Sequence, residues 1–410
     1  MSTMKLTQAT ATPVTSAPAP TPEAGNASST AHCTTHLRPL TCAQASGSGS
    51  ALAAPGTFKA RIQATAPVLT AEQLATYERD GYLVIKNFFP KELAAQLRQE
   101  AYALLCGLDL STHPLTRFTT SNSSKKGLSE AEAEAAEQNA KEAAPTKPQL
   151  HYFLESAVAR GFLFEEGAFN EAGERIKAKE LAINKLGHAL HLDAPPFRDF
   201  THTDTMARII ADLGFKDPVV LQSMLIFKQP DIGGKVDKHR DSTFLHTKPS
   251  TAVGFWFALE DCKKARDGYP GNGCLAFVPK SHKDGGNDRR FRRVGVIAES
   301  INNIPADQRK AVDPTALRGP DNSHTKLKFF GEDKTINTYP PEAWIEEEVP
   351  AGSLVVIHGD VCHMSSPNTS ADSRYIYTFH VFDDEGTQYP SDNWLQSKDL
   401  FKHFYSEPTP

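Results

Sequence analysis

The sequence predicts a mostly β fold, a sandwich or barrel of short strands, with flanking helices earlier in the chain. Five apolar runs between residues 219 and 382 have the length and the β-branched and aromatic content of buried strands. Glycine, proline and aspartate punctuate these runs, which favours a sandwich or barrel over repeated strand–helix–strand units. The five predicted strands are Val219–Phe227, Ala252–Leu259, Gly273–Pro279, Ser353–His358 and Tyr375–Phe382.

Length and composition narrow the class of protein. The chain has 410 residues, enough for one large domain or two ordinary ones with a substantial core. Its formal net charge of −5 is small for this size, so nothing indicates a nucleic-acid partner. No apolar run approaches the roughly 20 residues of a membrane-spanning helix, so we expect a soluble protein. The six cysteines form no C-x-x-C pair, so we expect free thiols in a reducing compartment, cytoplasmic or organellar.

Residues 1–66 have a composition that cannot bury enough surface to fold. Ala, Ser, Thr, Pro and Gly predominate, and Glu23 is the only acid. An acid-poor, hydroxyl-rich start fits either a disordered tail or an organelle transit peptide. We expect the folded domain at residues 67–405, with polar insertions at about 119–147 and 283–341. The sequence does not indicate an oligomeric state.

The first folded elements carry clear start and stop signals. Thr70 and Gln73 have the spacing of a capping box, which predicts a helix over Ala71–Arg79. A strand is predicted at Tyr82–Ile85, followed by an amphipathic helix at Lys91–Leu105.

The middle of the chain is more polar. Residues Ser129–Ala143 fit either a solvent-exposed helix or a disordered insertion. A further helix is predicted at about Lys177–His191, with four apolar residues around Lys185. Within the later polar span, the basic run Arg289–Arg293 fits a solvated loop or, alternatively, a contact for an anionic part of a substrate.

The tripeptide His-x-Asp recurs along the chain, and the copy at His239–Asp241 lies between two predicted strands. His191–Asp193 closes a helical segment, and His202–Asp204 lies between apparent helices. In extended backbone, residues two apart face the same side, so His239 and Asp241 can converge on one metal ion. His363, at a turn after the fourth predicted strand, is a candidate third ligand. Two histidines and one carboxylate form the facial triad of non-haem Fe(II) oxygenases, which leaves coordination positions open.

Arg374, just before the fifth predicted strand, adds a second chemical signal. Its guanidinium can bind a carboxylate through two parallel hydrogen bonds. An iron triad and a carboxylate clamp are together what a 2-oxoglutarate-dependent oxygenase needs. The keto acid chelates the metal at one end, and its far carboxylate pairs with the arginine.

With these motifs, residues from about Thr70 to Tyr405 resemble the phytanoyl-CoA dioxygenase family, specifically its domain-containing protein 1 branch. The resemblance implies a double-stranded β-helix, a cupin-like jelly-roll barrel whose one sheet is buttressed by helices. The stretches that carry it are Ala182–His191, Met224–Pro230, His239–Leu245, Gly273–His282 and Leu354–Arg374.

The resemblance also implies roles for individual residues. His239, Asp241 and His363 match the iron ligands. Arg374 matches the position that binds the distal carboxylate of 2-oxoglutarate, and Ser365 matches a hydroxyl that hydrogen-bonds to that carboxylate. The family's further contact residues for this cosubstrate correspond to Lys185, Met224 and Trp256.

The expected enzyme is an Fe(II)- and 2-oxoglutarate-dependent dioxygenase that also uses O2 and benefits from ascorbate as a reductant. Its substrate would be a small organic molecule, lipid-like among the options, hydroxylated with release of succinate and CO2. Apolar walls such as Phe227, Phe244 and Trp256 would keep water from the reaction. Arg240, between two ligands, would place a charge at the pocket mouth.

Each of these residues also has a purely structural interpretation. A lysine such as Lys185 in a helix is usually a surface residue. Met224 and Trp256 fit core packing, and Ser365 fits a turn cap. For the whole protein, the alternative is a non-catalytic jelly-roll module that binds a metal or small ligand without turning it over.

Overall fold

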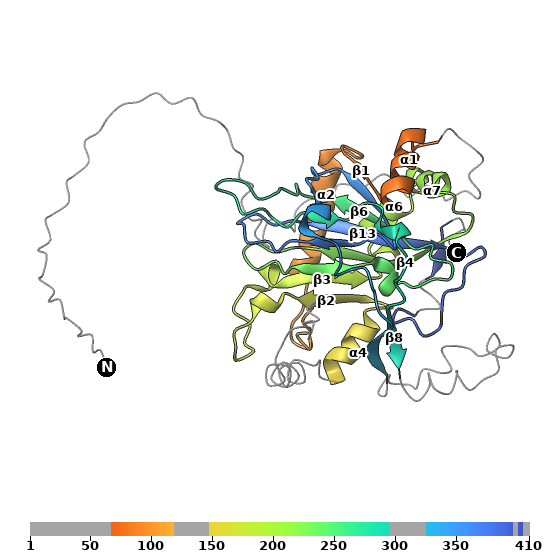
Figure 1. Cartoon of the computed structure of the whole chain (residues 1–410). Helices are drawn as coiled ribbons and strands as arrows, with labels where there is room; N and C mark the ends of the chain where they lie inside the picture. Colours follow the sequence, from red (N-terminus) through yellow and green to blue (C-terminus); the bar gives the residue numbers. More distant parts are fainter. Residues whose placement is uncertain (1–66, 119–146, 295–324, 397–400, 405–410) are drawn as a thin grey trace, which may run out of the picture. The chain divides into compact units, whose positions relative to one another are not determined.

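The computed structural model describes residues 67–118, 147–294, 325–396 and 401–404 (Figure 1). The expected tail or transit peptide at 1–66 lies outside these ranges, as do Ser129–Ala143 and residues 295–324 of the second insertion. Within the described residues the fold is mostly β, with strands in two facing antiparallel sheets and helices against one of them. This arrangement fits the expected jelly roll.

The larger sheet contains four of the five strands predicted in the second half of the chain. Along this sheet the described neighbouring strands pair antiparallel. The strand β14 (Lys402–His403) pairs with β4 beside the main path. In order across the sheet, the described strands are β1 (Tyr82–Ile85), β11 (Leu354–His358), β6 (Val253–Ala258), β13 (Ile376–Asp383), β4 (Pro218–Ile226), β3 (Ile183–His188) and β2 (Arg160–Phe164).

The smaller sheet contains the remaining predicted strand and carries the histidines of interest. Its described strands, in order, are β10 (Ile345–Glu347), β7 (Leu275–Phe277), β12 (His363–Ser365) and β5 (Val236–His239). A separate two-stranded ribbon pairs β8 (Arg290–Val294) with β9 (Lys326–Phe330).

The two faces of the larger sheet bury different cores. On its outer face, residues such as Phe255, Tyr377 and Phe379 join the core cluster that also contains residues of the helices. Figure 1 shows these helices gathered on one side of the sheet. On the inner face, Trp256 and Ile376 pack with residues of the smaller sheet, including Phe277. The covering helices are α1 (Ala71–Asp80), α2 (Lys91–Cys106), α6 (Pro195–Thr201) and α7 (Asp204–Asp212).

The first helix forms as its sequence predicts. The Thr70 hydroxyl accepts a hydrogen bond from the Gln73 backbone N–H, and the Gln73 side chain accepts one from the Thr70 N–H. Gly81 ends the helix with a φ of 81°, a conformation that glycine adopts without strain.

The helix predicted at about Lys177–His191 is wrong. The chain there forms a 3₁₀ turn at Lys179–Leu181, the strand β3, and a short helix α5 (Leu190–Asp193). Every residue of β3 is buried, and the strand pairs with β2 on one side and β4 on the other. Pairing on both edges therefore overrides the helix-like spacing of the apolar residues. The segment that follows α4 (Lys147–Glu155) thus adds two strands to the sheet.

The cysteines only partly match expectation. Cys262, Cys274 and Cys362 are free and buried. Cys106 is disulfide-bonded, so the expectation of free thiols throughout the chain is wrong at this residue.

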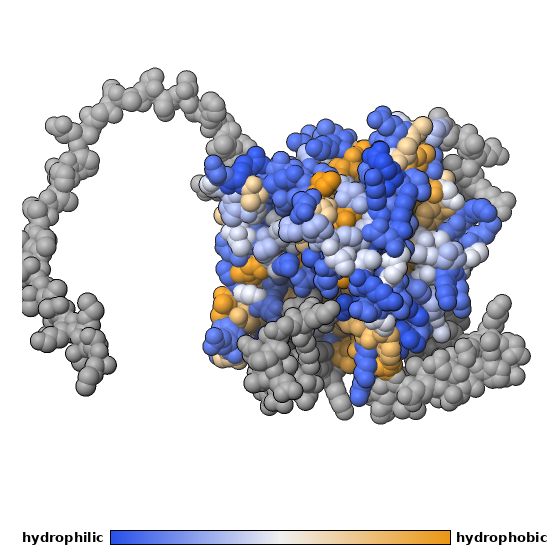
Figure 2. Space-filling view, viewed as in Figure 1, coloured by the Kyte–Doolittle hydropathy of each residue, from blue (hydrophilic) through white to orange (hydrophobic). Residues whose placement is uncertain are grey.

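The surface of the described part is largely hydrophilic, with separate hydrophobic patches, one of them near β8 (Figure 2). Among the described residues no helix combines the length and the apolar character needed to cross a bilayer.

Candidate active site

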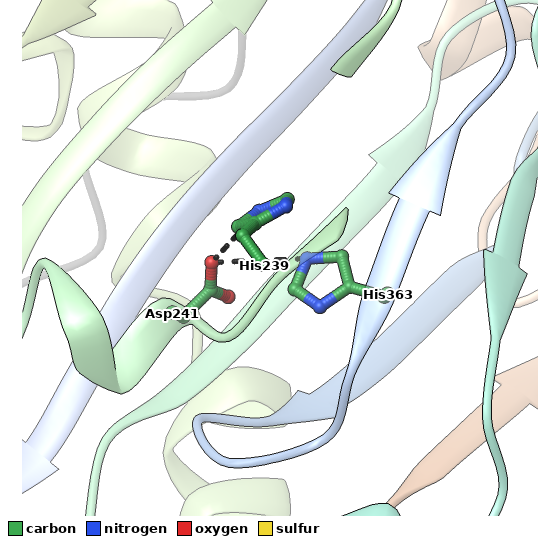
Figure 3. A group of neighbouring side chains, drawn as sticks. All are labelled: His239, Asp241 and His363. Carbon is green, nitrogen blue, oxygen red and sulfur yellow. Dashed lines mark ion pairs between the residues drawn. The ribbon is translucent and has the colours of Figure 1, made fainter. Parts of the chain in front are cut away.

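Two paired strands of the smaller sheet bring the three predicted metal ligands together. His239 ends β5, and His363 begins β12 directly opposite it in the antiparallel register. Arg240 is extended (φ −120°, ψ 135°), so Asp241, the first residue of a 3₁₀ turn that ends at Thr243, faces the same side as His239. Figure 3 shows the three side chains pointing toward one another.

The donor atoms are close enough to share one ion. His239 Nε2 lies 3.5 Å from Asp241 Oδ1, and His363 Nε2 lies 3.7 Å from the same oxygen. The three donor atoms all lie within 4.8 Å of one another. Two imidazoles and one carboxylate are the donor set of the facial triad that binds Fe(II).

The hydrogen bonds of both histidines prepare them for a metal. His239 Nδ1 lies 2.8 Å from the Asp237 carbonyl, and His363 Nδ1 lies 3.0 Å from the Val361 carbonyl. A carbonyl only accepts, so each Nδ1 carries the hydrogen and each Nε2 keeps a free lone pair. Burial, helped by the neighbouring His239, lowers the pKa of His363 to about 4, which keeps that ring neutral at pH 7.

The carboxylate is held by a residue outside the triad. His380 on β13 places Nε2 3.1 Å from Asp241 Oδ2 and thereby leaves Oδ1 for the metal. Gln222 Nε2 lies 3.4 Å from His380 Nδ1 on the adjacent strand. Burial alone would raise the pKa of Asp241, but the nearby His363 and His380 outweigh it, so the pKa lies well below its usual value. The residues present therefore fit a bound iron.

The expected cosubstrate contacts lie on the inner face of the larger sheet. One row of paired residues across the sheet contains Lys185 and Ile226. The row two residues along contains Gly187, Met224, Thr378 and Trp256. Lys185, Met224 and Trp256 therefore face the same space between the sheets. Lys185 is only 8% exposed, and its Nζ lies 3.2 Å from the Phe118 ring centroid. This buried position is compatible with a contact to the cosubstrate.

Arg374 and Ser365 border the same space. The guanidinium of Arg374 lies 5.5 Å from the Trp256 ring centroid, and Nη1 donates to the Gly273 carbonyl at 2.9 Å. Its Nε has no hydrogen-bond partner although the atom is buried. Ser365 lies two residues after His363 on β12, and its hydroxyl accepts a hydrogen bond from Lys228. A buried, incompletely bonded guanidinium indicates a site for an anion.

With this geometry established, the chain can be compared with known proteins. The model of the family described as phytanoyl-CoA dioxygenase matches residues 77–376. The chain belongs to the phytanoyl-CoA dioxygenase family. As a member, it is a 2-oxoglutarate-dependent dioxygenase that uses iron, 2-oxoglutarate and O2.

Individual relatives cover nearly all of the folded part. Phytanoyl-CoA dioxygenase domain-containing protein 1 of Danio rerio is 33% identical over 331 residues, which are 80% of this chain and 96% of that protein. The phytanoyl-CoA dioxygenase of Arabidopsis thaliana is 35% identical over 340 residues, 83% of this chain and 98% of that protein. Among solved structures, the epimerase SnoN in complex with Fe3+, alpha ketoglutarate and nogalamycin RO gives a TM-score of 0.46 at 14% identity, over 81% of this chain and 97% of that one.

One buried residue that contacts Ser365 is missing from the set predicted from the sequence of this phytanoyl-CoA dioxygenase. Lys228 follows β4 and is 1% exposed, with Nζ 2.8 Å from Ser365 Oγ. A lysine directly after the apolar run Val219–Phe227 was the available signal, because lysine is almost never fully buried without a partner. Its partner lies 137 residues away, which local pattern does not reveal.

Arg240 does not lie at a pocket mouth. The residue is 1% exposed, and its side chain leaves the extended backbone on the face opposite the two ligands. Arg240 Nε lies 2.8 Å from Asp333 Oδ2, and the guanidinium also donates to Ser281, Thr335, Tyr339 and Asp360. The expectation of a charge near the substrate is therefore wrong, and Arg240 instead anchors the 333–339 segment.

Two other expectations change in the structure. The basic run Arg289–Arg293 is not a loop, since most of it forms β8, and Arg290 and Arg292 both form ion pairs with Asp392. Phe227 is not a wall of the pocket. It packs 5.0 Å from the Tyr375 ring in the outer core. Phe244 does adjoin the site, with its ring centroid 6.2 Å from that of His239.

Proposed function

We propose that this dioxygenase holds iron with His239, Asp241 and His363 and hydroxylates a C–H bond of a small organic substrate, with release of succinate and CO2. The main support is the convergence of three donor atoms from two paired strands. Each ligand's remaining polar atom is already bonded to the protein. Iron in such a site activates O2 and couples decarboxylation of the keto acid to oxidation of the substrate.

The chain's own residues bind and orient the cosubstrate in this proposal. Arg374 takes the far carboxylate through its fork of N–H donors, and the Ser365 hydroxyl hydrogen-bonds to the same group. Trp256 lies against the Arg374 guanidinium and limits the space available to water. Met224 and Lys185 line the same face, one strand and two strands away from β13 respectively.

The aromatic side chains beside the triad support an apolar, lipid-like substrate. The Phe244 ring lies 5.8 Å from Phe291 on β8 and 6.0 Å from Phe329 on β9, measured between centroids. These rings extend from the His239 side of the site and offer apolar surface on which a hydrocarbon part can pack. Phe329 is 37% exposed, so this surface reaches solvent.

Replacing one ligand tests the proposal. Asp241→Ala removes the only carboxylate of the triad, so we expect succinate formation from 2-oxoglutarate to fall to background, with iron and ascorbate supplied. Asp199→Ala, which alters an exposed aspartate on α6, serves as the matched control and should retain activity. Unchanged succinate formation by the Asp241 variant would refute the assignment.

The same assay separates the enzyme from a non-catalytic module. Uncoupled turnover without added substrate is expected of the enzyme alone. Wild-type protein that binds iron and 2-oxoglutarate but forms no succinate would favour the module. The substrate can then be sought by comparing metabolites between cells with the wild type and cells with the Asp241 variant.

A further inference from the structure

The backbone places Lys228 directly opposite Arg374. Strands β4 and β13 pair Ile226 with Ile376, and two residues further the Arg374 N–H donates to the Lys228 carbonyl at 3.3 Å. Asn368 Nδ2 donates to the same carbonyl at 2.8 Å. The chain therefore brings two cationic side chains to neighbouring positions, each only 1% exposed.

The two side chains approach Gly273 together. Arg374 Nη1 donates to the Gly273 carbonyl, and a Cβ added at Gly273 would lie 2.5 Å from Lys228 Cε. Lys228 Nζ donates to Ser365 Oγ at 2.8 Å and to the Gly234 carbonyl at 2.7 Å. Since Ser365 accepts from the lysine, its own hydroxyl hydrogen remains available for an incoming acceptor.

No described carboxylate forms an ion pair with either of these cations. Within residues 67–118, 147–294, 325–396 and 401–404, neither Lys228 nor Arg374 forms an ion pair, and Arg374 Nε has no partner. Like charges held directly opposite each other and away from water are unfavourable. An anion bound between them would relieve this cost.

The other titratable groups that face Lys228 form no ion pair that would offset the two positive charges. Glu165, at the end of β2, uses Oε2 to accept from the Gly234 N–H, and its pKa is raised chiefly by burial. Lys185 is a further cation, and Cys262 is a buried thiol whose raised pKa keeps it neutral. Burial first, and Arg374 second, lower the pKa of Lys228 well below its ordinary value.

We propose that Lys228 is a second cationic ligand for the far carboxylate of 2-oxoglutarate and forms a three-sided clamp with Arg374 and Ser365. This inference rests on the proposed role of Arg374. The positive charge of the lysine attracts the carboxylate, and its hydrogen bond to Ser365 directs the serine hydroxyl toward that group. Burial, and Arg374 after it, disfavour the protonated form of Lys228, so we expect a bound carboxylate to favour proton uptake by this lysine.

Carboxylate binding to the metal-free, full-length protein tests this clamp without relying on turnover. Glutarate has the five-carbon length of the cosubstrate but no keto group, so its affinity reports carboxylate recognition. Calorimetric titration should show affinity lowered by about tenfold or more in Lys228→Met, because a charge-assisted hydrogen bond is lost. Lys216→Met is the matched control, since Lys216 is exposed and precedes the other end of β4, and its affinity should equal that of the wild type.

A pH series adds a readout that a purely structural lysine would not change. Wild-type affinity for glutarate should fall as pH rises through the lowered pKa of Lys228, because the neutral amine no longer attracts the anion. Lys228→Arg keeps its charge over this range and should lose that pH dependence while retaining tight binding. Lys185 is present in both proteins, so the difference between them isolates Lys228.

The outcomes separate this inference from the proposed function. If Arg374→Met weakens glutarate binding and Lys228→Met does not, the clamp lacks Lys228 and the proposed function stands. If neither substitution changes binding, the carboxylate site itself is wrongly placed. Should Lys228→Met fail to fold, equal pH dependence in the wild type and in Lys228→Arg would still overturn the inference.

Discussion

Two buried arginines, Arg240 and Arg374, are equally inaccessible to solvent at 1% exposure, yet their surroundings differ completely. Arg240 has a carboxylate partner in Asp333, and each of its guanidinium nitrogens donates a hydrogen bond. Arg374 has one hydrogen bond to a carbonyl, an unpartnered Nε and a lysine as its neighbour. The environments also act oppositely on charge. Asp333 outweighs burial and raises the pKa of Arg240, whereas burial lowers that of Arg374.

The comparison shows how to distinguish a structural buried charge from a binding one. A charge that serves the fold has all its donors satisfied within the protein, because any unsatisfied donor costs stability. A charge that serves a ligand keeps donors unsatisfied until the ligand arrives. Burial alone, which is the same for both arginines, carries no such information.

The largest effect on stability is expected at the satisfied arginine. Arg240→Met would leave the Asp333 carboxylate buried without its cation and lower the free energy of unfolding by about 3–5 kcal/mol. Urea denaturation measures the loss. The double variant with Asp333→Asn should recover much of it, because the uncompensated charge is gone. A loss below about 1 kcal/mol, the size of a surface pair, would contradict the anchoring role.

The unsatisfied arginine should show the reverse pattern. Arg374→Met is expected to raise the KM for 2-oxoglutarate by about thirtyfold or more, since a buried charged partner of the carboxylate is lost. The free energy of unfolding should change much less than in the Arg240 variant, because no described carboxylate forms an ion pair with Arg374. Steady-state kinetics and urea denaturation of one preparation provide both numbers. A large loss of stability with an unchanged KM would show that Arg374 serves the fold and not the cosubstrate.

A buried base extends the comparison to pH. Burial, with Lys185 adding, lowers the pKa of His188 to about 3, whereas an unfolded histidine titrates near 6.5. Between these values the unfolded chain binds more protons, so stability falls as pH drops. The wild type should lose about 1–2 kcal/mol more than His188→Gln between pH 7 and pH 5. Equal losses in the two proteins would assign the pH dependence to other groups.

The smallest effect is expected at a partly exposed ion pair. Asp392 pairs with Arg290 and Arg292, and all three side chains are 20–25% exposed. Asp392→Asn should therefore cost about 1 kcal/mol or less, and the cost should shrink in high salt. Thermal unfolding at two salt concentrations checks this. A salt-independent loss as large as that at Arg240 would show that partial exposure does not weaken the pair.

Much of the fold, and the shared face of His239 and Asp241, could be predicted because their signals are local. The five strands of the second half are short apolar runs between turn residues, and each is present within about two residues of its predicted limits. His239 and Asp241 share a face because extended backbone requires it. Their proposed third partner, His363, was predicted from position and resemblance at a turn, and in the structure it lies on β12 directly across from His239.

Where prediction failed, the deciding contacts are distant in sequence. The spacing of Ile183, Leu186 and Leu190 fits a helix, and only the pairing of β3 with two other strands makes it a strand. Arg240 alternates away from the ligands, but its burial depends on Asp333, 93 residues later. Local sequence patterns do not contain these contacts.

The short strand β12 carries both His363, a proposed metal ligand, and Ser365, a proposed contact of the cosubstrate carboxylate. Two residues of extended chain span roughly 6.5–7 Å, and neither end can shift without breaking the ladder to β7. In the proposed site, the backbone therefore fixes the distance between the groups that bind the two ends of the cosubstrate. It sets the length of diacid that can reach both, so keto diacids one carbon shorter or longer should be poor replacements.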